Sequence, residues 1–174
     1  MKPILCLDFD GVLHSYSSGW KGARCIPDPP VPGALEFVVA ALDRFTVAIL
    51  SSRSHQWFGR SAMKLWLFRH LVATAGDDYS DTPQWWRERI AQTAFADPWK
   101  DEVRHAAGLV VRSIQWPLHK PSAMVTIDDR ALTFTGAWPS MDELRAFQPW
   151  NKKPRGTEYV NCERAPCSPG DPLP

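Results

Sequence analysis

The chain has 174 residues, of which 44% are hydrophobic and 22% are charged, a balance that predicts one folded domain and excludes wholesale disorder. Its net charge of +1 argues against long-range attraction of nucleic acid, although a local basic patch stays open. No apolar stretch reaches the roughly 18 residues that a membrane span needs, and the first apolar run is too short for a signal peptide, so we expect no membrane partner.

Two carboxylates follow the first apolar run of the chain. Residues 4–7 show no polar alternation, which is typical of a strand buried on both faces of a parallel sheet. Asp8 and Asp10 would lie at the carboxyl end of this strand, where such sheets bind ligands. Neighbouring carboxylates in an apolar setting need a cation or a shared proton. At this point an Asp-x-Asp could equally hold the metal of a glycosyl or nucleotidyl transferase.

The segment that follows, residues 14–32, is polar and aromatic. It contains Gly19 and Gly22 and ends in the proline cluster of residues 27–32, which predicts an excursion over the strand end rather than a core element. A solvated connection would have the same composition. The position directly after the carboxylates favours a flap at the substrate rim, in which Trp20 contacts the substrate.

A helix and a second buried strand come next. An apolar stripe with helical spacing predicts an amphipathic helix over residues 33–44, and a β-branched run predicts a strand over residues 45–50. A crossover helix between two buried strands makes a right-handed unit whose strands are parallel, with their carboxyl ends together. The polar residues after the second strand should therefore lie beside Asp8: Ser51, Ser52 and Arg53.

The middle of the chain predicts further helices and one strand. Residues 54–71 have helical periodicity, and their interleaved aromatic and basic side chains favour core packing with a solvated face over a nucleic-acid platform. Thr82 and Pro83 predict the N-cap and first residue of a short helix. The apolar run over residues 108–114 predicts a strand.

The last quarter of the chain predicts one more strand and a tail. Residues 123–127 indicate a buried strand that ends in Asp128 and Asp129, with Lys120 just before it. Residues 140–143 form a capping box for a short helix, and residues 149–174 predict a disordered Pro-rich tail. The four cysteines show no metal-ligand spacing, so we expect a reduced, cytoplasmic protein.

Four polar clusters thus stand at or just before strand ends, and their order resembles the four motifs of the haloacid dehalogenase-like (HAD) hydrolase superfamily. The motifs match residues 8–11 (Asp-x-Asp-Gly), residues 47–51 (a strand ending in Ser), Lys120, and residues 127–129 (a strand ending in paired acids). The resemblance spans residues 4 to about 136. It implies a domain over residues 1–148 with an α/β fold: a doubly wound, Rossmann-like parallel sheet with a minimal cap.

The resemblance also implies roles for individual residues. Asp8 would be the nucleophile, Asp10 the general acid and base, and Lys120 the cation that offsets charge on the phosphate. Mg²⁺ would be the cofactor, and its implied protein ligands are Asp8, Asp10 (through its backbone carbonyl), Asp128 and Asp129. Contacts with the substrate would come from Gly11, Ser51 and Ser52, whereas Arg53 would either contact the substrate or have a structural role. The flap loop, not the resemblance, is the reason to expect a contact from Trp20. An unperturbed aspartic acid titrates near pH ~4, so Asp10 would need like-charge neighbours to hold its proton.

The predicted function is a Mg²⁺-dependent phosphomonoester hydrolase that acts through an aspartyl-phosphate. Its partner would be a phosphorylated small molecule or a macromolecular end, because relatives with small caps often act on large substrates. A nucleic-acid 3′-phosphatase is a second hypothesis, motivated by the open site and by the Arg and Lys residues of 54–70. A non-catalytic phosphate or Mg²⁺-binding module is the third, although such a module would not need Asp10 as a second carboxylate.

Overall fold

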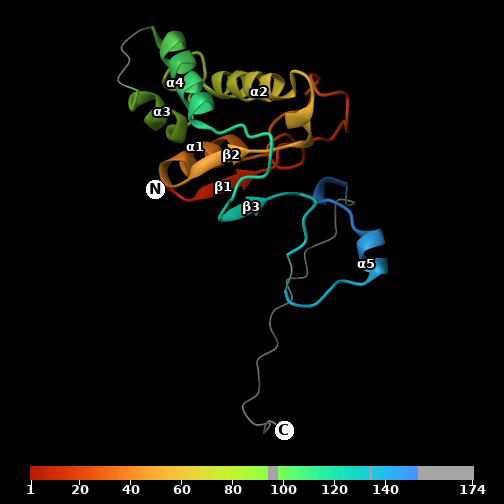
Figure 1. The fold of residues 1–174 in the computed structure, drawn as a ribbon. Helices are drawn as coiled ribbons and strands as arrows, with labels where there is room; N and C mark the ends of the chain where they lie inside the picture. Colours follow the sequence, from red (N-terminus) through yellow and green to blue (C-terminus); the bar gives the residue numbers. More distant parts are fainter. Residues whose placement is uncertain (94–97, 134, 153–174) are drawn as a thin grey trace, which may run out of the picture.

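The computed structural model describes residues 1–93, 98–133 and 135–152. Its centre is a parallel sheet of three strands in the order β2-β1-β3, formed by β1 (Ile4–Leu7), β2 (Thr46–Ile49) and β3 (Val125–Ile127) (Figure 1). Leu7 pairs with Ile49 on one side and with Ile127 on the other, so all three strands end at the same level. This register brings together the segments that follow the strands, and it confirms a mixed α/β fold with a parallel sheet.

Strands β1 and β2 and the helix between them are confirmed. Helix α1 (Ala34–Arg44) buries one apolar stripe, and β1 and β2 are buried over all but their first residues. The N-cap residue of α1 is Gly33, which has φ of 80°. A left-handed backbone of this kind strains other residues, so glycine suits the tight entry into the helix.

Two long helices cover one side of the sheet. Helix α2 (Gly59–Thr74) packs against α4 (Trp99–Ser113), and Figure 1 shows both above the strands. Helix α3 (Gln84–Ala91) contacts α4 and α1. The core-facing side chains of α2 recur at helical spacing, with Met63, Leu67 and Leu71 each fully buried.

The strand predicted over residues 108–114 is wrong, because these residues belong to α4 except for Ile114. The local run is apolar and β-branched, but the residues before it complete a helical stripe: Val103, Ala106, Ala107 and Val110 are the buried residues of α4. Acidic residues in the first turn and Arg112 in the last turn also suit the helix dipole. A single residue after α4, Gln115, forms a parallel bridge with Ala48 of β2.

Three further details differ from the predictions. Strand β3 is not buried, because it is an edge strand in which Val125 is 44% and Ile127 39% exposed. The predicted helix over residues 54–71 is instead a 3₁₀ turn, η1 (Ser52–His55), followed by α2. Thr82 does not cap α3: Pro83 holds that position, while the Thr82 hydroxyl bonds to the loop before it.

The C-terminal part of the described chain leaves the sheet and then returns to it. Helix α5 (Met141–Ala146) begins with the predicted capping box, which Ser140 and Glu143 complete. The 3₁₀ turn η2 (Trp150–Lys152) falls within the predicted tail, and the Trp150 Nε1 donates a hydrogen bond of 2.7 Å to the carbonyl oxygen of Gly11. The rest of that tail, residues 153–174, lies outside the described residues. Within the part of the chain that is described, no helix is both long and apolar enough to cross a membrane.

Candidate active site

The carboxyl ends of the three strands open into a pocket of about 490 Å³. Six of the residues predicted to act in the site line it: Asp8, Asp10, Ser51, Ser52, Lys120 and Asp128. They come from the ends of β1, β2 and β3 and from the segment before β3, although up to 120 positions separate them in the sequence. The shared register of the strands accounts for this convergence. We call this hollow the acidic pocket.

Three carboxylates meet beside the acidic pocket. One oxygen from each of Asp8, Asp128 and Asp129 lies within 4.8 Å of the others. The Asp129 side chain is fully buried, and both its oxygens lack a hydrogen-bond partner among the described residues. Among the described residues, Arg130 is the one cation that pairs with Asp129, with its Nε 3.7 Å from Asp129 Oδ2, beyond hydrogen-bonding distance.

Two carboxyl groups of this cluster, Asp8 and Asp129, have raised pKa values. Burial raises the pKa of Asp8 to about 7, and the nearby charges of Asp128, Asp129 and Asp10 add to the increase. Burial also raises the pKa of Asp129. Carboxylates that are both desolvated and close to one another are stabilised by a hard cation, and Mg²⁺ prefers oxygen ligands. Asp8, Asp128 and Asp129 could therefore hold a divalent cation.

Asp10 has a different environment from the one that we expected. Its Oδ1 lies 2.9 Å from His14 Nδ1, and its Oδ2 accepts a hydrogen bond of 2.7 Å from Arg53 Nε. Burial alone would favour the protonated acid, but the hydrogen bonds from His14 and Arg53 outweigh it and lower the pKa of Asp10. The expectation of like-charge neighbours that keep Asp10 protonated is therefore wrong, because a cation and a ring donor hold it as a carboxylate.

The tautomer of His14 follows from its second partner. The backbone N–H of Asp28 donates to His14 Nε2 at 3.2 Å, so in the neutral ring Nδ1 carries the proton and donates it to Asp10. Both His14 and Asp28 are buried, and Asp28 in turn accepts hydrogen bonds from the backbone and hydroxyl of Ser18. Hydrogen bonds of the buried residues His14 and Asp28 thus hold the loop of residues 14–32 against Asp10.

Arg53 joins this loop to Asp10. It is fully buried, and its Nη1 donates to the carbonyl oxygens of Gly22, Ala23 and Cys25 at 2.8, 3.1 and 3.3 Å. The ring of Trp20 lies over the guanidinium, 4.5 Å from its carbon. Neither Arg53 nor Trp20 lines the acidic pocket, so the structure does not bring these two residues to the substrate position that we predicted for them.

Glycine is required at position 11 because the side chain of Asp129 lies against its backbone, whereas the sequence predicted that a phosphate would do so. Gly11 has φ of 89°, and a Cβ at this position would collide with the carboxylate of Asp129. The sequence suggested that Gly11 lets the backbone pass a phosphate. In the structure the missing side chain makes room for the buried acid.

Sequence reasoning missed three polar side chains that also line the acidic pocket: His55, His119 and Arg130. The last two adjoin Lys120 and Asp129 in the sequence, which was a usable signal. Tyr16 has φ of 54°, and its ring lies 5.8 Å from the Arg130 guanidinium carbon. Within the loop of residues 14–32, Tyr16 is the residue that reaches the acidic pocket.

Comparison with known proteins gives no neighbour from which a role could be transferred. No protein-family model, no curated protein and no solved structure matches the chain.

Proposed function

We propose that this protein is a Mg²⁺-dependent phosphomonoester hydrolase with a HAD-like core, in which Asp8 is the nucleophile. The observation that carries the proposal is the cluster of Asp8, Asp128 and Asp129 beside the acidic pocket, which Ser51 and Lys120 also line. The strand order supports the doubly wound core. Gln115 bridges to β2, which pairs with β1, which pairs with β3, and this spatial order is that of part of a Rossmann-like sheet.

The cation would be held by Asp8, Asp128 and Asp129. When bound, Mg²⁺ supplies positive charge that neutralises these acids and the phosphate oxygens beside them. The buried oxygens of Asp129 give the best support for this assignment, because neither has a hydrogen-bond partner among the described residues and Arg130, 3.7 Å away, compensates the charge only in part.

Asp8 carries the covalent chemistry of the proposal. A carboxylate oxygen of Asp8 forms a bond to phosphorus while the bond from phosphorus to the leaving oxygen breaks, and the leaving group takes the electron pair. Water then attacks the phosphorus of the aspartyl-phosphate, which releases phosphate and restores Asp8. Asp10 is poised as a base for the second step, because His14 and Arg53 hold it ionised.

Ser51 and Lys120 would hold the transferred phosphoryl group. The Ser51 hydroxyl oxygen accepts a hydrogen bond from the backbone N–H of Arg53 at 3.3 Å, which leaves the hydroxyl proton for a phosphate oxygen. Lys120 lines the pocket, and no described acid forms an ion pair with it. Its ammonium group is therefore available for a substrate anion.

The test is phosphate release from para-nitrophenyl phosphate in Mg²⁺ and in EDTA. We expect turnover that requires Mg²⁺ and that falls by at least about a thousandfold in Asp8→Asn, since a nucleophile has been removed. Asp142→Asn, an exposed acid on α5, is the matched control and should keep wild-type activity. Full turnover in EDTA, or an active Asp8→Asn, would contradict the proposal.

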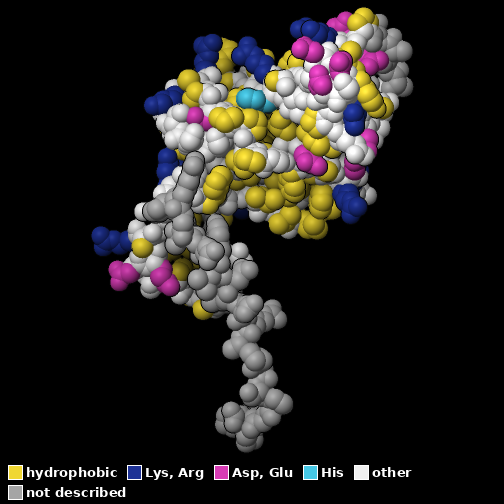
Figure 2. Space-filling view, turned by 180° about the vertical axis from the view of Figure 1, so that it is seen from behind, with side chains coloured by type: hydrophobic (Ala, Val, Ile, Leu, Met, Phe, Trp, Pro, Cys, Tyr) yellow, Lys and Arg dark blue, Asp and Glu magenta, His cyan; other side chains and the backbone are white. Residues whose placement is uncertain are grey.

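A second candidate, a nucleic-acid 3′-phosphatase, is favoured by the surface of α2. This helix carries Arg60, Lys64 and Arg69 and has no acidic residue, and Trp57 just before it is 86% exposed. Figure 2 shows dark-blue side chains concentrated at the upper left of that face and magenta ones at the upper right. The test compares a 3′-phosphorylated oligonucleotide with small sugar phosphates. An equal rate for both, with no effect of salt on binding, would dismiss this candidate.

A third candidate remains a phosphate or Mg²⁺-binding module without activity. It would be established by phosphate analogues that bind in a Mg²⁺-dependent manner while no monoester in a broad panel turns over.

A further inference from the structure

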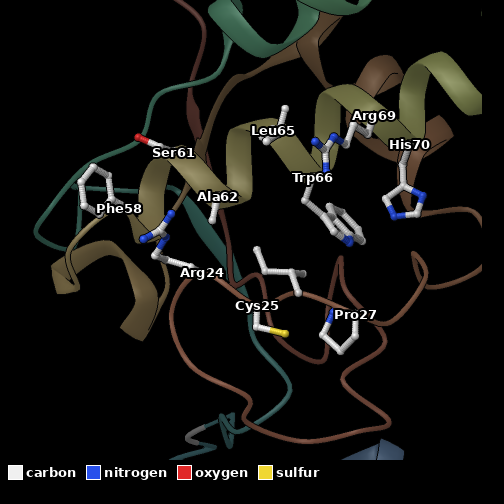
Figure 3. Close-up of a pocket in the computed structure, with 11 residues that line it drawn as sticks. Arg24, Cys25, Pro27, Phe58, Ser61, Ala62, Leu65, Trp66, Arg69 and His70 are labelled. Atoms are coloured by element: carbon white, nitrogen blue, oxygen red, sulfur yellow. The ribbon is translucent and has the colours of Figure 1, made fainter.

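A second cavity, separate from the acidic pocket, lies between α2 and the loop of residues 14–32. Its volume is about 540 Å³, which is within the range of small-molecule sites. Figure 3 shows α2 along one wall and the loop along the other, with Arg24 and Phe58 at one end and Arg69 and His70 at the other. The two cavities share no lining residue.

The lining of this second cavity is basic and contains no carboxylate. Arg24 projects from the loop and Arg69 from α2, so the two guanidinium groups belong to opposite walls. Neither forms a hydrogen bond or an ion pair with a described residue, and the guanidinium of Arg24 lies 5.0 Å from the ring of Phe58. Two unpaired guanidinium groups at one cavity favour an anion, and Arg binds phosphate oxygens in a bidentate manner.

The floor between these charges is apolar. Ile26 and Pro27 from the loop, and Leu65 and Trp66 from α2, line it, and Phe58 is 59% exposed at the rim. Burial lowers the pKa of His70, so its ring is a neutral hydrogen-bonding group at neutral pH. A ligand that fills the cavity therefore has an apolar, flat body as well as negative charge.

The cavity is already formed, because hydrogen bonds hold both walls. The carbonyl oxygens of Gly22, Ala23 and Cys25 accept from Arg53, which fixes the loop from below. Trp66 Nε1 donates to the carbonyl oxygen of Asp28 at 3.2 Å, which joins α2 to the same loop. A site of this kind requires little ordering when its ligand binds.

We propose that this cavity binds a phosphate that carries an aromatic ring, the chemistry of a nucleotide, with the ligand spanning the apolar floor so that its phosphate meets one of Arg24 and Arg69 and its ring meets the other. Such a ligand could be a free nucleotide or the last nucleotide of a single strand, and both offer the same ring and phosphate. The inference does not depend on the proposed hydrolase activity, because the acidic pocket contributes no residue to this site.

Calorimetric titration of the full chain in EDTA tests the proposal with adenosine monophosphate. Without a cation, the acids of the acidic pocket repel phosphate. Nucleotide binding measured in EDTA therefore reports a different site. We expect saturable binding that weakens by at least about tenfold in Arg24→Ala and in Arg69→Ala, the loss expected for one charge-assisted hydrogen bond or one cation–π contact. The variants lie on separate elements, so failure of one to fold leaves the other as a test.

Arg60→Ala is the matched control, because it removes the same charge from the same helix outside the cavity. It should weaken binding by less than about twofold, the effect of general attraction alone. An equal loss in all three variants, or no saturation at millimolar nucleotide, would overturn the proposal. Adenosine and inorganic phosphate should each bind more weakly than the nucleotide; phosphate binding as tightly as the nucleotide would also overturn it.

Further titrations identify the source of the ligand. A short single-stranded oligonucleotide that binds more tightly than the mononucleotide, with the same dependence on Arg24 and Arg69, assigns the cavity to a nucleic-acid end. Equal affinity for both assigns it to free nucleotides. A tighter oligonucleotide complex that is insensitive to both arginines would contradict the site.

Discussion

Asp8 and Asp10 are two positions apart, and their surroundings move their proton affinities in opposite directions. Burial and three like charges raise the pKa of Asp8, whereas hydrogen bonds from His14 and Arg53 lower that of Asp10. Paired carboxylates with opposed pKa values are a feature of active sites that divide two roles between two acids. Here the separation suits Asp8 for a cation and Asp10 for a base.

The raised pKa of Asp8 makes the stability of the metal-free protein dependent on pH. A carboxyl group with a higher pKa in the folded state binds more protons when folded, so its contribution is complete below pH 3.8 and is lost as the pH rises to about 7. In EDTA, wild type should therefore lose a few kcal/mol relative to Asp8→Asn between those limits. Urea unfolding of both proteins at pH 5 and pH 8 measures the difference.

Saturating Mg²⁺ should reverse this dependence, because a cation favours the ionised form of Asp8. A difference between wild type and Asp8→Asn that is the same at pH 5 and pH 8 in EDTA would show that Asp8 is not desolvated in the way the structure indicates.

Gly11 and Gly22 form a natural pair for testing the geometry of the carboxylate cluster. Both have φ near +90° or above, but a Cβ would meet Asp129 only at Gly11, while it would meet nothing within 4 Å at Gly22. Gly22→Ala should cost about 1 kcal/mol of backbone strain and leave Mg²⁺ affinity unchanged. Gly11→Ala should also displace Asp129 and weaken Mg²⁺ binding by at least about tenfold. Equal Mg²⁺ affinities in the two variants, measured by calorimetry, would separate Asp129 from the metal.

The packing of α2 on α4 is the main contact between helices, and α2 also forms one wall of the second cavity. Leu67 of α2 is fully buried, whereas Leu65 on the same helix is 47% exposed. We expect Leu67→Ala to lower the free energy of unfolding by about 2–5 kcal/mol, because it leaves a void in the core. Leu65→Ala should change it by less than about 1 kcal/mol. Chemical denaturation of both variants checks this, and similar losses would place the core elsewhere.

Elements with an unambiguous pattern could be predicted from the sequence, and the ambiguous ones could not. Strands β1 and β2 each follow from a continuous apolar run, and helix α1 follows from an apolar stripe with helical spacing. The residues 108–114 did not reveal their helix, because the part of the stripe that decides the matter, Val103 to Ala107, lies before the run. The exposure of β3 was hidden for a related reason: an apolar sequence does not say whether a further element covers the strand.

At the scale of the whole molecule, the carboxylate cluster could be predicted and its surroundings could not. Polar residues after parallel strands converge whatever the loops do, so Asp8, Ser51 and Asp128 were accessible from the sequence. The partners of Asp10 were not, because Arg53 is 43 positions away and no local pattern indicates that it turns toward Asp10. The link from Trp150 to Gly11 spans 139 positions and has no sequence signal at all.

The proposed attack of Asp8 on phosphorus can be tested by trapping the covalent product. The full chain would be mixed with phosphorus-radiolabelled para-nitrophenyl phosphate and Mg²⁺, quenched in acid and digested into peptides. We predict label on the peptide that contains Asp8, released by hydroxylamine as expected of an acyl phosphate, and no label on Asp8→Asn. Turnover with the label on any other residue, or steady turnover by Asp8→Asn, would show that Asp8 is not the nucleophile.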